Sequence, residues 1–196
     1  RRPTDRRPID LPRTIADTLD VLFERIQKHG ISVETVFPDA LPPALADPDQ
    51  ISQVLLNLLV NAIHAMPEGR RVRLSLSRRD RYLALAVADT GHGIPKDILP
   101  KVFNPFFTTK EVGKGTGLGL TVVHGIISEH GGTIAVVSEP GRGTTFTLIL
   151  PLTQVVMNAL GLCMYARGLG HDLRSQLGGI GDVSGRDRAL FAGAAV

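Results

Sequence analysis

QVLLNLLVNAIHAM, residues 53–66, is the stretch that decides the fold of this chain of 196 residues. Asp47 and Pro48 precede it as an N-cap and a first helical residue, so we expect one helix from Asp47 to Met66. Most of its residues are apolar, which predicts a largely buried helix. Four polar side chains nevertheless recur three or four residues apart and share one helical face: Gln53, Asn57, Asn61 and His64.

Two of these polar residues, Asn57 and Asn61, are amides one helical turn apart, and a buried amide needs hydrogen-bonding partners. A single buried asparagine is explained by a bond to nearby backbone. Two asparagines that point the same way from an apolar helix are better explained by a polar ligand or a hydrated cation. The polar face of this helix is therefore a candidate binding surface.

The segments on either side of this helix predict the other elements of the fold. Apolar residues at helical spacing indicate an amphipathic helix over 11–28 and a further helix that ends near His130. Alternating apolar residues indicate strands at 31–37, 72–76, 83–89, 133–138 and 144–150, of which the last four form two hairpins. This order of elements predicts an α+β fold, a two-layer α/β sandwich with helices on one face of a mixed sheet.

The composition and charge exclude several classes of protein. With 43% hydrophobic and 21% charged residues the chain is neither disordered throughout nor collagen-like. The net charge of +3 comes from residues 1–13, so the basic character belongs to a terminal arm and does not indicate a nucleic-acid partner. A single cysteine, Cys163, excludes an internal disulfide and fits a reducing cytosol. No apolar run is long enough to cross a bilayer, so we expect a cytoplasmic chain without membrane contact.

Asp89 is the first candidate residue outside the central helix. It shares strand parity with Leu83, Leu85 and Val87, so its carboxylate is predicted to project from the inward face at the end of a strand. An inward carboxylate needs a hydrogen-bond donor, and an adenine amino group would suit it. The sequence DTGHGIP, residues 89–95, is equally compatible with a simple aspartate-capped turn, so both interpretations stay open.

A loop of about 25 residues precedes the last helix and is longer than an ordinary connection. Its final part, Gly113 to Gly119, leads directly into that helix, where free backbone N–H groups and the positive helix end favour a bound phosphate. Its glycine spacing fits neither a P-loop nor a dinucleotide fingerprint. A flexible linker is the alternative, although a linker need not be followed at once by an apolar helix.

Four motifs in this order resemble the catalytic ATP-binding domain of bacterial sensor histidine kinases, in the superfamily that also holds gyrase and the mismatch-repair ATPases. QVLLNLLVNAIHAM resembles the N box, DTGHGIP the first glycine box, FNPFFTTK (residues 103–110) the F box, and GKGTGLGL (residues 113–120) the second glycine box. The resemblance runs from about Ile9 to Pro151. It implies the Bergerat, or GHKL ATPase, fold with a mostly antiparallel sheet.

The resemblance also implies a role for each candidate residue. Asp89 would accept a hydrogen bond from the adenine amino group, and Thr144 would complete a water-mediated contact. Asn61 and Asn57 would hold Mg²⁺ against the triphosphate of ATP. Residues 95–115 would form a mobile lid, with Phe103, Phe106 and Phe107 packing its base. The remaining nucleotide-binding candidates are Gly91, Gly93, Ile94, Lys110, Lys114, Gly115, Thr116, Gly117, Leu118 and Gly119; Asn57 and Lys110 are also the candidate catalytic residues.

Three departures from the family pattern refine this prediction. In the gyrase branch, the position that matches Asn57 looks like a glutamate that activates water. An amide cannot act as a general base, so fast ATP hydrolysis is not expected. His64 stands where related kinases often carry Lys or Arg. None of the six histidines lies in the family's acceptor motif, so we expect the chain to donate the γ-phosphoryl group to a histidine on a separate phosphoacceptor and dimerisation domain.

The implied function is therefore that of a protein histidine kinase catalytic part in two-component signalling, with a response regulator downstream. Two alternatives are a nucleotide-gated interaction module and a slow stand-alone ATPase. Three segments are expected: a linker remnant over 1–9, the ATP-binding catalytic domain over 10–151, and a glycine-rich, partly flexible extension over 152–196. Within that extension, residues 155–165 are apolar enough for a short helix.

Overall fold

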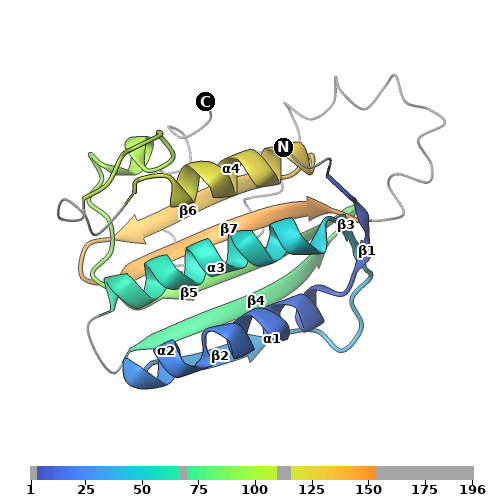
Figure 1. The fold of residues 1–196 in the computed structure, drawn as a ribbon, viewed down its shortest axis with the longest axis horizontal. Coiled ribbons are helices and arrows are strands. Elements are labelled where there is room, and N and C mark those ends of the chain that lie inside the picture. The colour runs from blue at the N-terminus through green and yellow to red at the C-terminus, as the bar shows by residue number, and fades with distance from the viewer. Residues whose placement is uncertain (1–3, 67–69, 110–115, 153–196) are drawn as a thin grey trace. The chain divides into compact units, whose positions relative to one another are not determined.

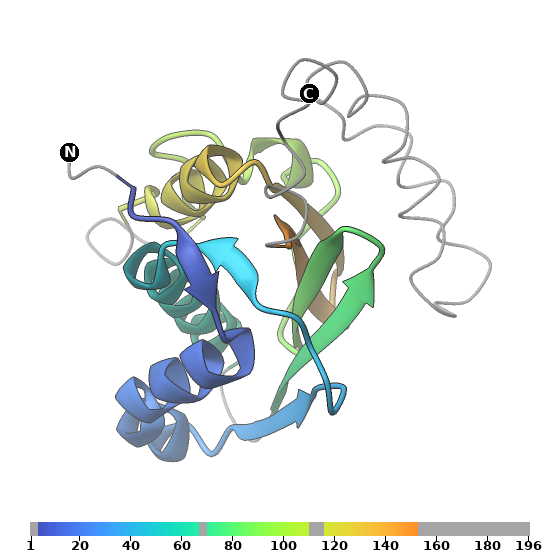
Figure 2. The same ribbon diagram turned by 90° about the vertical axis from the view of Figure 1, so that its right-hand side faces the viewer.

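The computed structural model describes residues 4–66, 70–109 and 116–152. Its helices cover one face of a five-stranded sheet, which confirms the predicted two-layer α+β sandwich (Figure 1). The view turned by 90° shows the helices on the same side of the sheet (Figure 2). The helices are α1 (Leu11–Val21), α2 (Phe23–Lys28), α3 (Pro48–Ala65), the short 3-10 helix η1 (Leu99–Lys101) and α4 (Gly119–Glu129). The strands are β1 (Arg7–Ile9), β2 (Ser32–Val36), β3 (Ala44–Ala46), β4 (Arg71–Arg79), β5 (Tyr82–Asp89), β6 (Thr133–Glu139) and β7 (Gly143–Pro151).

The five-stranded sheet has the order β2-β4-β5-β7-β6. β2 runs parallel to β4, and the other neighbours are antiparallel, so the predicted mixed and mostly antiparallel sheet is confirmed. Its helix-facing side is apolar over most of its length. Leu74, Val87 and Phe146 are neighbours across β4, β5 and β7, and all three are buried.

Helix α3 packs at the centre of the helical layer. The carboxylate of Asp47 caps it by accepting hydrogen bonds from the backbone N–H groups of Asp49 (3.0 Å) and Gln50 (3.2 Å). Its fully buried positions include Ile51 and Leu55, as expected for a helix covered on most sides. The predicted helix from the Asp47 cap to Met66 is thus confirmed.

The first helical segment differs from the prediction of a single helix over 11–28. It divides at Leu22 into α1 and α2. The backbone N–H of Leu22 bonds to the carbonyl of Leu19, three residues back, which interrupts the regular ladder of hydrogen bonds. The hydroxyl of Thr18 also donates to the carbonyl of Thr14 (2.7 Å), a contact that is known to bend helices.

Two short strands, β1 and β3, were not predicted from the sequence. They pair antiparallel with each other, with Arg7 opposite Ala46 and Ile9 opposite Ala44. Ala44 and Ala46 are fully buried. Three-residue strands carry too little alternation to be recognised, since they are defined by the pairing partner rather than by local sequence.

Helix α4 contains a glycine whose replacement is expected to stabilise the domain. An added Cβ at Gly125 would meet no atom within 4 Å, and glycine in a helix interior is less favourable than alanine. We expect Gly125→Ala to raise the free energy of unfolding by about 0.5 to 1 kcal/mol. Urea unfolding of the two proteins measures this difference, and a lower midpoint for the variant would contradict it.

No helix among the described residues is both long and apolar enough to span a bilayer.

Candidate functional site

One row of polar residues interrupts the apolar, helix-facing side of the sheet. Asp89, Thr144 and Ser138 lie side by side on β5, β7 and β6, with Asp89 opposite Thr144 and Thr144 opposite Ser138. Their exposed fractions are only 8%, 5% and 5%. Buried polar side chains need partners, so this row is the natural starting point for a site.

The two carboxylate oxygens of Asp89 differ in their hydrogen bonds. Oδ1 accepts hydrogen bonds from the backbone N–H groups of Gly91 (2.8 Å) and Thr144 (3.3 Å). No hydrogen bond joins Oδ2 to any of the described residues. Burial raises the pKa of the Asp89 carboxyl, and the two backbone hydrogen bonds and the nearby His92 lower it by a smaller amount. Strand parity therefore placed this side chain correctly, and its free oxygen can accept a hydrogen bond from a ligand.

The raised pKa of Asp89 predicts a pH dependence of nucleotide binding. Only the ionised carboxyl presents an acceptor at both oxygens. ATP affinity should therefore fall as the pH is lowered through the pKa of Asp89, which is higher than that of an ordinary aspartate. The effect on stability has the opposite sign, since protonation relieves the cost of burying the charge. Titrations of ATP at a series of pH values should show this step in the wild type and not in Asp89→Asn. The same pH profile in both proteins would contradict the prediction.

Ser138 connects the polar row to the start of the loop after Gly93, and it is not among the site residues predicted from the sequence. Its Oγ accepts a hydrogen bond from the backbone N–H of Ile94 (2.7 Å), donates to the carbonyl of Gly143 (2.9 Å) and lies 2.9 Å from Thr144 Oγ1. The available signal was its inward strand parity with Val136, which predicts a polar side chain pointing into the core. Ile94 itself packs against the hydrophobic core.

The two glycines of residues 89–95 let the backbone pass between neighbouring elements. A Cβ at Gly91 would lie 2.7 Å from the carbonyl oxygen of Ala65, at the end of α3. Gly93 has a φ of +71°, and its Cβ would lie 2.1 Å from the carbonyl oxygen of Glu139. These approaches fix the loop between α3 and the turn that joins β6 to β7, because a side chain at either glycine would force the backbone to shift.

Asn57 and Asn61 are half-buried on α3, and no hydrogen bond joins either amide to another of the described residues. An ideal Cβ at Gly119 would lie 3.6 Å from Asn57 Oδ1, so the amide faces the first residue of α4. Gln53 and His64, on the same polar face of the helix, are exposed. Backbone bonding within the described residues thus does not account for the two amides.

The segment after Ile94 is anchored by one of its three predicted phenylalanines. Phe103 packs against the core, its carbonyl accepts a hydrogen bond from Thr121 Oγ1 (3.1 Å), and its ring lies 5.6 Å from that of His124. The expectation that Phe106 packs the base of a lid is wrong, because its side chain is 75% exposed. Its backbone makes the contact instead: a Cβ at Gly117 would lie 2.4 Å from the carbonyl carbon of Phe106.

The second glycine box is described only from Thr116 onward. The hydroxyl of Thr116 accepts a hydrogen bond from the backbone N–H of Leu118 (3.4 Å), and α4 begins at Gly119. The first N–H groups of a helix have no partner within the helix and are available to an anion. The candidates Lys110, Lys114 and Gly115 lie outside the described residues, as does the predicted short helix over 155–165.

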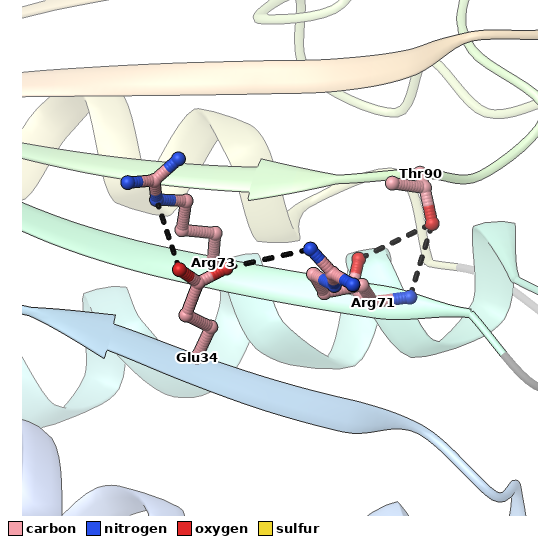
Figure 3. Close-up of polar contacts among 4 residues, drawn as sticks. All are labelled: Glu34, Arg71, Arg73 and Thr90. Atoms are coloured by element: carbon pink, nitrogen blue, oxygen red, sulfur yellow. Dashed lines mark hydrogen bonds and ion pairs between the residues drawn. The ribbon is translucent and has the colours of Figure 1, made fainter.

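Contacts with the start of β4 hold the end of β5 in place. The hydroxyl of Thr90, the residue after Asp89, accepts a hydrogen bond from the backbone N–H of Arg71 (3.0 Å), and Figure 3 shows this contact beside two ion pairs. Glu34 on β2 pairs with Arg71 (3.7 Å) and Arg73 (3.8 Å) on β4. These exposed ion pairs contribute little to stability. The hydrogen bonds that Thr90 makes with the backbone of Arg71 instead fix where Asp89 leaves the sheet.

Comparison with known proteins agrees with this geometry. Residues 46–154 match the family described as histidine kinase-, DNA gyrase B-, and HSP90-like ATPase. The sensor kinase CckA of Brucella abortus is 46% identical over 158 residues, which cover 73% of this chain and 17% of CckA. The sensor histidine kinase ZraS of Escherichia coli is 42% identical over 144 residues, which cover 74% of this chain and 30% of ZraS.

Among solved structures, the nucleotide-free catalytic domain of the histidine kinase ThkA is similar, with a TM-score of 0.69 and 32% identity. That match covers 76% of this chain and 96% of the ThkA domain. The chain spans less than a third of the length of the two sensor kinases, CckA and ZraS, and nearly the whole of this one domain. The chain therefore belongs to the histidine kinase-, DNA gyrase B- and HSP90-like ATPase family, and within it corresponds to the catalytic domain of sensor histidine kinases.

Proposed function

We propose that this chain binds Mg-ATP and presents its γ-phosphoryl group to a histidine on a separate dimerisation and phosphoacceptor domain. The observation that carries the proposal is the buried Asp89, whose Oδ1 is held by two backbone N–H groups while Oδ2 has no partner among the described residues. A carboxylate fixed in this way can accept a hydrogen bond from the adenine amino group.

The residues present on α3 fit a magnesium ion. Mg²⁺ prefers oxygen ligands and is commonly held by one or two protein groups together with phosphate oxygens. Asn57 and Asn61 offer two amide oxygens one helical turn apart, without competing hydrogen bonds to the described residues, and Asn57 faces the start of α4. When bound there, Mg²⁺ would offset the negative charge that the phosphate oxygens carry.

The contribution of the chain itself is to bind and orient the nucleotide. Asp89 holds the base, the two asparagines hold the ion, and the N–H groups at the start of α4 stabilise phosphate oxygens. By resemblance to the family, Lys110, Lys114 and Gly115 add further phosphate contacts. Transfer then rests on positioning and charge neutralisation, with little covalent chemistry for the protein to perform.

We place this catalytic unit at residues 10–151, with residues 1–9 as a linker that joins the domain through β1 and residues 152–196 as an extension. As in the two-component systems to which sensor kinases belong, the phosphorylated histidine would pass its phosphoryl group to a response regulator. We place this step in the cytoplasm, where ATP is available.

The amide at position 57 distinguishes a kinase from the slow stand-alone ATPase. A general base is needed to activate water, and the amide of Asn57 cannot accept a proton. We expect Asn57→Glu to raise the rate of ATP hydrolysis about tenfold or more. Steady-state release of phosphate measures this rate. Gln53→Glu, at an exposed position on the same polar face of α3, is the matched control. An unchanged rate in Asn57→Glu would contradict the general-base argument.

Transfer of labelled phosphate in trans tests the proposed function. The chain is incubated with Mg-ATP and the isolated phosphoacceptor domain of the relative CckA, and acid-labile phosphohistidine is measured. We expect phosphohistidine with the wild type and little with Asp89→Asn. ATP binding without any phosphohistidine would instead favour the nucleotide-gated interaction module, in which nucleotide-dependent order controls a partner without phosphoryl transfer.

A further inference from the structure

We infer that Ser138 is a positioning residue that turns the hydroxyl of Thr144 into a hydrogen-bond acceptor toward the base, and that the site thereby selects a purine with a 6-amino group over one with a 6-oxo group. The inference rests on the proposed function, because it assumes that a nucleotide base occupies the space beside Asp89. It assigns a role to a side chain that does not itself touch the nucleotide.

The hydrogen count at Ser138 leaves one arrangement that satisfies every group. A hydroxyl has one hydrogen to donate and two lone pairs to accept with. The N–H of Ile94 can only donate to Ser138 Oγ (2.7 Å), and the carbonyl of Gly143 can only accept from it (2.9 Å). The hydrogen of Ser138 therefore goes to Gly143, so the contact of 2.9 Å with Thr144 Oγ1 needs Thr144 as its donor.

Thr144 consequently has no hydrogen left for a ligand. Its hydroxyl hydrogen points to Ser138, and its backbone N–H points to Asp89 Oδ1 (3.3 Å). What remains available at Thr144 Oγ1 is a lone pair. Asp89 and Thr144 are direct cross-strand neighbours, and such side chains stand about 5 Å apart. The end of the sheet thus presents two acceptors, Asp89 Oδ2 and Thr144 Oγ1, and no donor from either side chain.

Two acceptors side by side discriminate between the common purines. A 6-amino group donates hydrogen bonds and matches them, whereas a 6-oxo group is itself an acceptor and can pair with neither oxygen. A bridging water keeps the same polarity: with its hydrogens directed to Thr144 Oγ1 and Asp89 Oδ2, it offers its lone pairs to the base. We expect inosine triphosphate to bind the wild type at least about tenfold more weakly than ATP.

The experiment compares the affinities of Mg-ATP and Mg-inosine triphosphate by calorimetry in the wild type and in Ser138→Ala. Removing the serine hydroxyl frees the hydrogen of Thr144 to donate to a 6-oxo group. The ratio of the affinity for ATP to that for inosine triphosphate should therefore fall about tenfold. Ser138→Thr keeps a hydroxyl and should restore the wild-type preference. Thr18→Ala removes another buried hydroxyl, on α1, and should leave the preference unchanged.

A second variant separates this role from a merely structural one, since Ser138 also ties Ile94 to the sheet. Thr144→Val removes the acceptor itself and should lower the ratio of ATP to inosine triphosphate affinity by a similar factor. The double variant with Ser138→Ala should lower this ratio no further. An unchanged preference in either Ser138→Ala or Thr144→Val, while ATP still binds the wild type, would overturn the inference alone. Failure of the wild type to bind ATP would overturn the proposed function instead.

Discussion

Asp89→Asn is expected to weaken ATP binding by about 10- to 100-fold. The two backbone N–H groups that bond to Oδ1 require an acceptor there, so they orient the new amide with its carbonyl oxygen in that position. The amide nitrogen then stands where Oδ2 was and presents a donor to the adenine amino group, which is also a donor. The substitution thus reverses the hydrogen-bonding polarity that faces the base.

This reversal can be measured by titrating both proteins with ATP and with inosine triphosphate. ATP affinity should fall sharply, while inosine triphosphate, whose 6-oxo group accepts a hydrogen bond, should lose less affinity or gain some. Asp20→Asn, at an exposed position on α1, is the matched control and should bind ATP like the wild type. Equal ATP affinity in Asp89→Asn and the wild type would show that this carboxylate does not hold the base.

Gly93→Ala is expected to lower the free energy of unfolding by about 2 to 5 kcal/mol and to abolish measurable ATP binding. Two independent features of Gly93 produce this effect. Its φ of +71° lies in the left-handed region, which costs energy for any residue with a Cβ, and that Cβ would lie 2.1 Å from the carbonyl oxygen of Glu139. The loop after Asp89 would have to move away from the turn between β6 and β7.

Gly141 offers a control that separates the two causes. Its φ is +79°, close to that of Gly93, but an added Cβ would meet no atom within 4 Å. Gly141→Ala should therefore carry only the conformational cost, about 1 to 2 kcal/mol, and should retain ATP binding. Urea unfolding of both variants measures the difference. Equal losses of stability would show that backbone conformation alone, and not the close approach to Glu139, requires glycine at position 93.

The elements that the sequence predicted are those whose signal is local. The apolar pattern and Asp-Pro start of α3 and the alternation in the hairpins are contained within single segments, so α3, β4 to β7 and the side of the sheet that Asp89 faces followed from periodicity. The pairing of β1 with β3 depends on residues far apart in the chain, and no local sequence pattern predicts it. The division between α1 and α2 involves individual hydrogen bonds at Leu22 and Thr18, which the apolar spacing does not predict.

The same distinction explains which site residues were found. Asp89, Asn57 and Asn61 can be recognised from the sequence because each is a polar residue within an apolar segment. Ser138 gives a weaker sequence signal, because its importance comes from the register that places it opposite Thr144 on a neighbouring strand. The prediction for Phe106 was wrong because an aromatic residue in a loop is expected to pack by its ring. Here the ring is exposed, and the backbone of Phe106 makes the contact with Gly117.

Asp89 and Thr144 together are expected to recognise the edge of an adenine base, with Ser138 orienting the hydroxyl of Thr144. The most direct test is a calorimetric titration of the wild-type chain with Mg-ATP and, under the same conditions, with Mg-inosine triphosphate. We expect one ATP site per chain and an affinity for inosine triphosphate that is at least about tenfold lower than that for ATP. Equal affinity for the two nucleotides, or no heat of binding with ATP, would contradict it.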